Sequence, residues 1–176
     1  GTFRRIREFK VTNSELWVRL TLVTYDDFPA LEWGLEFENR GNRDTPLLSD
    51  VWPAEFKFQG RFGERFILHH VDGSQAKPTD FQPRETELPP LATVTFEPEG
   101  GRSSDGVLPY FNLTKSDGGI VMAIGWTGQW RATFARDASH TVAIRMGQSE
   151  TRLVLHPGEK IRTPSILVLF YKGDWL

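Results

Sequence analysis

Residues 118–130 read G-G-I-V-M-A-I-G-W-T-G-Q-W, and this stretch decides the fold that we expect. Its apolar run extends from Ile120 to Trp126 with a single glycine inside it. A short run between glycine-rich turns is typical of a strand buried on both faces, and its β-branched residues favour a strand over a helix. After the turn, residues 130–134 alternate between apolar and polar. We therefore predict a hairpin with aromatic residues at its tip, at the centre of a sheet.

The rest of the chain adds strands and no helix. Further strands are expected at 3–11, 16–22 and 31–38, in two short pieces within 47–58 around Pro53, and at 141–146, 152–155 and 165–171. No window of about ten residues shows the 3.6-residue apolar period of a helix. Many short strands joined by Gly- and Pro-rich turns indicate an all-β fold, a large antiparallel β-sandwich without substantial helix. We expect residues 1–176 to form one such domain.

Composition excludes several classes of protein. The 176 residues include no cysteine, so the chain has neither disulfides nor a thiolate metal site. With 21 basic and 23 acidic residues, it lacks the basic footprint of a nucleic-acid-binding protein. The small cluster of Arg4, Arg5 and Arg7 is better explained as an exposed strand edge. No run reaches the length of a membrane span and no signal peptide is recognisable, so we expect no membrane partner. A removed signal would leave the same pattern; the location stays open, with the cytoplasm slightly favoured.

Two segments break the strand pattern. Residues 72–90 are punctuated by five glycines and prolines, and residues 99–105 form a second polar, Gly-rich segment. Long irregular segments inside a compact domain are usually functional loops or interfaces. Within or next to them lie apolar residues that a solvated loop does not need: Phe81, Leu88, Leu91, Leu108, Tyr110 and Phe111. We predict that the two loops meet on one side of the sandwich and form a docking surface.

Three motifs, in order, resemble one known family. The first is G-R-S-S-D-G at 101–106, leading to L-P-Y-F-N at 108–112; the second is A-I-G-W-T-G-Q-W at 123–130; the third is L-H-P-G-E at 155–159 followed by R-T-P. They are similar to motifs of the melibiase-type α-galactosidases, glycoside hydrolase family thirty-six. There they belong to the N-terminal β-supersandwich domain, which has a galactose-mutarotase-like fold. Gln129 stands where the family often has Asn.

The resemblance implies a non-catalytic domain. In that family a retaining pair of Asp residues lies in a separate (β/α)₈ barrel, which needs about 250 residues and eight helices. The resemblance therefore implies an accessory domain that packs on such a barrel, contributes to oligomer contacts and substrate entry, and meets galactoside-type carbohydrate through the parent enzyme. We expect no cofactor and no metal. An independent carbohydrate-binding module and a mutarotase-like epimerase are the alternatives.

The two tryptophans and the two adjacent histidines are candidate binding residues. Trp126 and Trp130 can stack against a sugar ring, but filling the core at a strand end is the more common role of Trp. His69 and His70 follow an apolar run, and adjacent residues of a strand point to opposite faces, so they cannot chelate one metal together. Either can contact a sugar hydroxyl or act as an acid or base; a hydrogen-bonded structural role is the plainer interpretation.

The remaining candidates lie in loops. By the resemblance, Asp50 with Trp52 belongs to a region that reaches towards a barrel mouth; its plain interpretation is a turn residue. Residues Arg102, Ser103, Ser104 and Asp105 carry the first motif and contact either substrate, barrel or solvent. Two carboxylates among Glu97, Glu99 and Asp105 would be the minimum for a glycosidase of its own. Tyr110 and Phe111 are expected on the docking surface.

Overall fold

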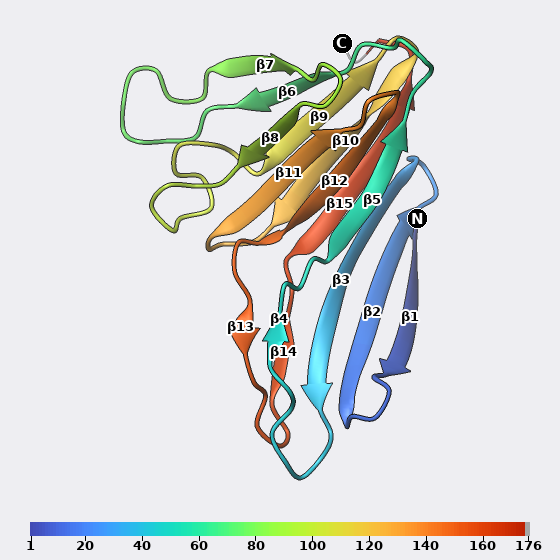
Figure 1. Ribbon diagram of the computed structural model, residues 1–176, viewed down its shortest axis with the longest axis vertical. Coiled ribbons are helices and arrows are strands. Elements are labelled where there is room, and N and C mark those ends of the chain that lie inside the picture. Colours follow the sequence, from blue (N-terminus) through green and yellow to red (C-terminus); the bar gives the residue numbers. More distant parts are fainter. Residues whose placement is uncertain (175–176) are drawn as a thin grey trace.

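The structure is a computed structural model that describes residues 1–174, and it is built from antiparallel strands (Figure 1). Within these residues there is no helix, as the sequence predicts. The strands are β1 (Thr2–Lys10), β2 (Leu16–Tyr25), β3 (Ala30–Asn39), β4 (Leu48–Ser49), β5 (Ala54–Gln59), β6 (Ile67–Val71), β7 (Pro83–Glu87), β8 (Thr93–Phe96), β9 (Tyr110–Lys115), β10 (Gly118–Gly125), β11 (Trp130–Arg136), β12 (Thr141–Gln148), β13 (Arg152–Leu153), β14 (Lys160–Arg162) and β15 (Ser165–Lys172).

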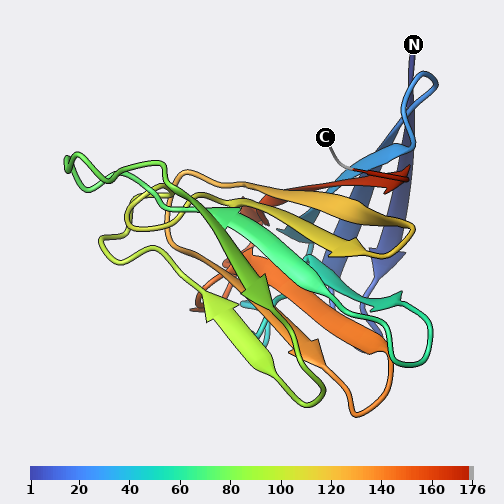
Figure 2. The same ribbon diagram turned by 90° about the horizontal axis from the view of Figure 1, so that it is seen from above.

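Two main sheets form the sandwich. The larger one has nine strands in the order β1-β2-β3-β15-β10-β9-β6-β7, with β14 also paired to β3. The smaller one has the order β5-β12-β11-β8, and β4 and β13 pair separately. Figure 2 shows the two layers from above. The large sheet therefore has two edges, β1 and β7, and β10 lies in its middle, as predicted.

The core lies between the two sheets because the strands alternate. Inward residues of β10 and β11 are fully or almost fully buried, among them Met122 and Phe134, while their neighbours along the strand are only half-buried. The main core joins the small sheet to β15, β10, β9 and β6. A second, smaller core forms where β4 and β13 cover β2 and β3 around Phe37 and Leu155. Strand β1 is covered by neither, and all nine of its residues are exposed.

The predicted hairpin at 118–134 is wrong. Strand β10 pairs with β9 and β15, whereas β11 pairs with β12 and β8 in the other sheet. The turn at 126–129 carries the chain from one layer to the other. Strand β10 is also buried fully on one face only, since Val121 and Ala123 on the other face are half-buried. The alternation of the two strands fits a crossover as well as a hairpin, because each strand presents one apolar face to the shared core.

The structure confirms most of the other strands that the sequence predicts. The strands expected near the N-terminus, around Pro53 and in the last third of the chain are present, and the Arg4–Arg7 cluster lies on an edge strand. The segment 72–90, predicted to be irregular throughout, contains β7. Proline lacks an N–H for a central ladder, and Pro83 accordingly begins a strand at the sheet edge.

The buried Arg136 closes one end of the core. It is the last inward residue of β11, following Trp130, Ala132 and Phe134. Its guanidinium donates to the carbonyl oxygens of Leu88 (2.7 Å), Glu64 (2.8 Å) and Ser139 (3.3 Å) and lies 5.0 Å above the Phe66 ring. These carbonyls belong to three different connections. One cation thus ties the β5–β6, β7–β8 and β11–β12 connections together.

Replacing this cation should destabilise the whole domain. Arg136→Met keeps an apolar stem but leaves buried carbonyls without donors, at a cost of about 1–3 kcal/mol for each unsatisfied group. We expect a loss of about 3 kcal/mol in the free energy of unfolding, measured by urea denaturation. Arg145→Met is the matched control, because Arg145 on the adjacent strand makes only an exposed ion pair with Glu55 (2.7 Å) and should cost less than about 1 kcal/mol. Equal losses in the two variants would contradict this role.

Candidate functional site

Most of the predicted site residues gather at the end of the sandwich opposite Arg136. We call this region the loop end; it comprises residues 47–52, 72–82, 97–109, 126–129 and 149–151. Strands β6, β8, β10 and β12 end here, and β5, β7, β9 and β11 begin here. Figure 1 shows the two longest loops projecting beside β7 and β8.

The two irregular loops meet, as the sequence predicts. The Ser74 N–H donates to the Ser104 carbonyl oxygen at 2.8 Å, and Asp72 forms an isolated bridge with Val107. The Gln75 amide donates to the Glu99 carboxylate at 2.8 Å. Gly73 permits this approach, since a β-carbon there would overlap the Ser104 carbonyl oxygen. The loops therefore form one connected structure.

Trp130 anchors these loops from inside the core. Its side chain is fully buried and meets Phe111 edge-on at 5.8 Å between ring centres. Its indole N–H donates to the Ser103 carbonyl oxygen at 2.7 Å. The prediction that core filling outweighs sugar stacking is therefore confirmed for Trp130. Trp126 is half-buried and packs against the same core.

The carboxylates of the loop end are already engaged. Glu97 accepts from Arg131 at 3.0 Å and from the Gln129 amide at 3.3 Å. Burial of Glu97 favours the neutral acid, but these hydrogen bonds outweigh it and lower the pKa of Glu97. Asp105 pairs with Arg102 at 3.1 Å. The arrangement suits loop fixation better than the acid–base pair of a glycosidase.

Asp50 and Trp52 line a pocket of about 530 Å³ next to this cluster. Asp50 is exposed and has a left-handed backbone, with φ of 52°, which suits a turn residue. The segment is fixed from below, because the Trp33 indole donates to the Pro53 carbonyl oxygen at 2.7 Å. The pocket wall is polar and is completed by Arg131, Gln148, Glu150, Thr151 and Arg152. Asp50 therefore lines the same pocket as Arg131, which pairs with Glu97.

His69 and His70 point to opposite faces of β6, as predicted. His70 faces inward, where its ring lies 4.5 Å from that of Phe96 and its Nε2 is 3.0 Å from Thr86 Oγ1. Burial lowers the pKa of His70. His69 lies on the outer face, with Nδ1 3.3 Å from Glu85 Oε1 and Nε2 3.3 Å from Thr114 Oγ1. Both ring nitrogens of His69 therefore have polar neighbours.

The outer face of β6 and β9 is hollowed next to His69. Tyr110 is 56% exposed there and lines an apolar pocket of about 410 Å³ together with His69, Glu85 and Asn112. Phe111, Leu88 and Leu91 were predicted on the docking surface with Tyr110, and this is wrong. Leu91 is exposed but lies at the Arg136 end of the sandwich, where its N–H donates to the Asp137 carbonyl oxygen. Adjacent residues of β9 face opposite sides, and Phe111 is buried in the core with Leu88.

The sequence did not predict Arg131 or Gln129 as site residues. Arg131 is the polar neighbour of Trp130 in an alternating strand, and this position is the signal that could have identified it.

The described residues show no metal site and no membrane-spanning helix. Among residues 1–174 no three His, Asp or Glu side chains are grouped as a metal site would require. In the same part of the chain no helix is long and apolar enough to cross a membrane.

Loss of the Trp130 hydrogen bond should loosen the loop end without opening the core. Trp130→Phe keeps an aromatic ring but frees the Ser103 carbonyl, and we expect faster amide hydrogen exchange in residues 97–106 together with a loss of about 1–3 kcal/mol in stability. Trp126→Phe is the control, because Trp126 lies at the same crossover but is half-buried. Unchanged exchange of residues 97–106 in the Trp130 variant would refute the anchor.

Comparison with solved structures identifies the fold. No model of a protein family matches the chain, and no curated protein sequence is significantly similar to it. The chain is similar to the galactosidase domain of the α-galactosidase–sucrose kinase AgaSK (TM-score 0.77, 17% identity, 98% of this chain and 24% of that one). It is also similar to an α-galactosidase from Lactobacillus brevis (0.79, 13%, 97% and 23%). A third similar structure is the GH36 α-galactosidase AgaA from Geobacillus stearothermophilus (0.69, 16%, 98% and 28%). Almost the whole chain therefore has a fold that occurs within α-galactosidases, and it spans about a quarter of their length.

Proposed function

We propose that this chain is a non-catalytic accessory domain of an α-galactosidase-like glycoside hydrolase and that its loop end docks on the catalytic barrel. The observation that carries the proposal is the coverage: 97–98% of the chain superimposes on about a quarter of each similar α-galactosidase. The remaining three quarters of such a chain leave ample length for a (β/α)₈ barrel of about 250 residues.

The surface of the loop end supports a docking role. Phe81 is 57% exposed and Tyr110 is 56% exposed, although the loops that carry or adjoin them are held in place by hydrogen bonds. An ordered loop with exposed aromatic side chains is typical of a surface that becomes buried against a partner. The engaged carboxylates Glu97, Glu99 and Asp105 support a structural role for the same region.

A carbohydrate-binding module is the second candidate. The exposed Tyr110 ring beside His69 and Asn112 supplies the apolar face and polar groups that a sugar needs. Variants of AgaA have been solved with raffinose and with stachyose, which makes raffinose a suitable probe. The mutarotase-like epimerase requires a His and a carboxylate in one cleft. His69 and Glu85 are residues of the required types, but they lie 3.3 Å from each other, and the second ring nitrogen of His69 lies 3.3 Å from Thr114 Oγ1. Both side chains are thus engaged with each other rather than placed on two sides of a substrate.

Removing the exposed aromatics should weaken docking. In the proposed longer enzyme, with its barrel, Phe81→Ser with Tyr110→Ser should lower the unfolding free energy by about 2 kcal/mol, because each half-exposed ring loses burial worth about 1 kcal/mol. In the present chain alone the same pair should change little. Phe62→Ser with Leu91→Ser is the control, since both residues are exposed but lie away from the loop end. Calorimetry with raffinose tests the second candidate. If the present chain binds raffinose and Tyr110→Ser abolishes this binding, the result favours the sugar-binding module.

The present chain should not hydrolyse 4-nitrophenyl α-galactoside faster than buffer does. The expectation follows from the loop-end carboxylates, each of which is bound to a cation or an amide rather than paired across a substrate-sized gap. Release of nitrophenolate is followed with Glu97→Gln and Asp105→Asn as companions. Turnover that either substitution removes would replace the accessory role with that of a small glycosidase.

A further inference from the structure

The free edge of β1 is unusually open. All nine residues of β1 are exposed, including Phe3, Ile6 and Phe9. The opposite edge of the sheet, β7, is short and begins with a proline, which protects an edge against pairing. Strand β1 contains no proline or glycine and is the longer of the two. It offers a row of backbone donors and acceptors for another strand.

The register identifies which residues offer these groups. The Gly1 carbonyl oxygen accepts from the Asp26 N–H at 3.0 Å, and the Val11 N–H donates to the Leu16 carbonyl oxygen at 2.9 Å. Hydrogen-bonded positions alternate along an antiparallel pair, so the odd-numbered residues of β1 bond to β2. The backbone groups of the even-numbered residues therefore point away from the sheet. These residues are Thr2, Arg4, Ile6, Glu8 and Lys10.

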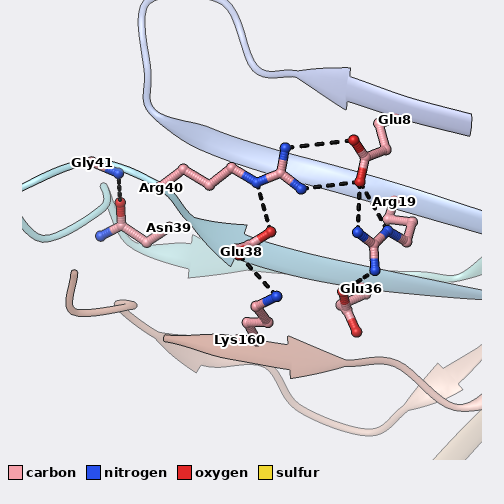
Figure 3. Close-up of polar contacts among 8 residues, drawn as sticks. All are labelled: Glu8, Arg19, Glu36, Glu38, Asn39, Arg40, Gly41 and Lys160. Atoms are coloured by element: carbon pink, nitrogen blue, oxygen red, sulfur yellow. Dashed lines mark hydrogen bonds and ion pairs between the residues drawn. The ribbon is translucent and has the colours of Figure 1, made fainter. Parts of the chain in front are cut away.

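Charges alternate across the outer face and end at this edge. The register places Glu8 opposite Arg19, Arg19 opposite Glu36, and Glu36 opposite Arg162 on four adjacent strands. Arg19 donates to Glu8 at 2.9 Å and to Glu36 at 3.1 Å (Figure 3). We call this row the charge ladder. It runs minus, plus, minus, plus from β1 inward, so a cation beyond β1 would continue it.

A second cation holds the edge carboxylate in place. Arg40 donates to Glu8 at 3.0 Å and to Glu38 at 2.6 Å, while its guanidinium lies 4.5 Å above the Trp17 ring. Hydrogen bonds from Arg40 and Arg19 lower the pKa of Glu8. Lys160 pairs with Glu38 at 2.9 Å on the far side, as Figure 3 shows. The Glu8 carboxylate is thus charged and oriented at the free edge.

We propose that β1 is a self-association edge: two copies of the chain pair through antiparallel β1 strands across a two-fold axis at Ile6. In this register, Ile6 faces Ile6 of the second copy, and Arg4 faces Glu8 of the second copy. Both pairs consist of residues whose backbone groups point outward, so every free group can bond. Arg4 of the second copy then supplies the cation that extends the charge ladder, and by symmetry this happens twice.

The opposite face of β1 fits the same register. It places Phe3 opposite Phe9 of the second copy, again twice, and aromatic cross-strand pairs stabilise antiparallel strands. One juxtaposition opposes association, because Arg5 faces Arg7 of the second copy. A register shifted by two residues loses the Arg4–Glu8 pairs and places Arg4 opposite either Ile6 or Lys10. The register centred on Ile6 is therefore the one in which charge and aromatic pairs agree.

This surface is distinct from the docking surface of the proposed function. Strands β1 and β7 are the two opposite edges of the nine-stranded sheet, and the loop end adjoins β6 and β7. Figure 1 shows β1 on one side of the molecule and the long loops on the other. Pairing of β1 strands leaves the loop end free, so each proposal can fail without the other.

The same charge reversal at two neighbouring positions, Arg4 and Arg5, should change dimer affinity in opposite directions, and this tests the proposal. Analytical ultracentrifugation of the present chain should show a monomer–dimer equilibrium with a Kd on the order of 10–100 µM, as expected for a small interface. Arg4→Glu places like charges opposite Glu8 and should weaken the dimer at least tenfold. Arg5→Glu, the matched control, makes the same charge change one residue further on, but replaces an Arg–Arg contact by an attractive pair and should tighten the dimer. A monomer at 500 µM, or shifts of both variants in the same direction, would overturn the proposal.

Cross-linking tests the position of the two-fold axis. The natural chain has no cysteine, so Ile6→Cys introduces one thiol, and directly opposed residues of antiparallel strands lie within the range of a disulfide. Mild oxidation should give a covalent dimer at or below the concentration at which the natural chain associates. Lys10→Cys is the control, because the two Lys10 residues lie far apart in this register. Equal yields from the two variants, with urea denaturation showing both folded, would refute the register.

Discussion

Strand β11 holds the sandwich closed at both ends. Its first inward residue, Trp130, donates to the Ser103 carbonyl oxygen in the loops, and its last inward residue, Arg136, donates to carbonyl oxygens of three connections at the other end. Between them Ala132 and Phe134 are fully buried. One face of a seven-residue strand therefore supplies both the apolar centre of the core and the polar groups that fix its two rims. A core residue therefore anchors the loop end.

The unequal width of the two sheets determines which surfaces remain open. Four strands cannot cover nine, so the main core ends at β15 and the edge of β3, and the β4–β13 pair covers only part of the remainder. Strand β1 belongs to the large sheet but lies beyond the strands that the small sheet and the β4–β13 pair cover. Its side chains therefore pack against no second sheet. The order of residues along the strand suits contact either with solvent or with a partner. The charge ladder ends on this strand at Glu8, where a cation of a partner would extend it.

The sequence predicts what depends on local pattern and misses what depends on register. Alternation at 31–38 and the Gly/Pro turns predict the strands and the all-β class, and adjacency on β6 predicts that His69 and His70 diverge. Whether residues 118–134 form a hairpin or cross between sheets is not encoded locally, because both place Met122 and Phe134 in one core. Phe111 was wrongly predicted at the surface for a similar reason. The sequence alone does not show that β9 begins at Tyr110, and therefore does not show which of Tyr110 and Phe111 faces the core. The Arg19–Glu36 and Arg131–Glu97 pairs join residues 17 and 34 positions apart, and only the pairing of strands brings them together.

The symmetry of β1 pairing bears on how an accessory domain can serve a larger enzyme. A two-fold axis through Ile6 is perpendicular to the sheet, so the strands of the second copy run opposite to those of the first. The two loop ends then lie at opposite ends of the joined sheet and point in opposite directions. Partners docked on them would be separated by the width of both copies and would not collide. A head-to-tail contact through β1 and β7 would instead repeat without closing. The proline that begins β7 counts against that arrangement, whereas nothing in β1 blocks the closed one.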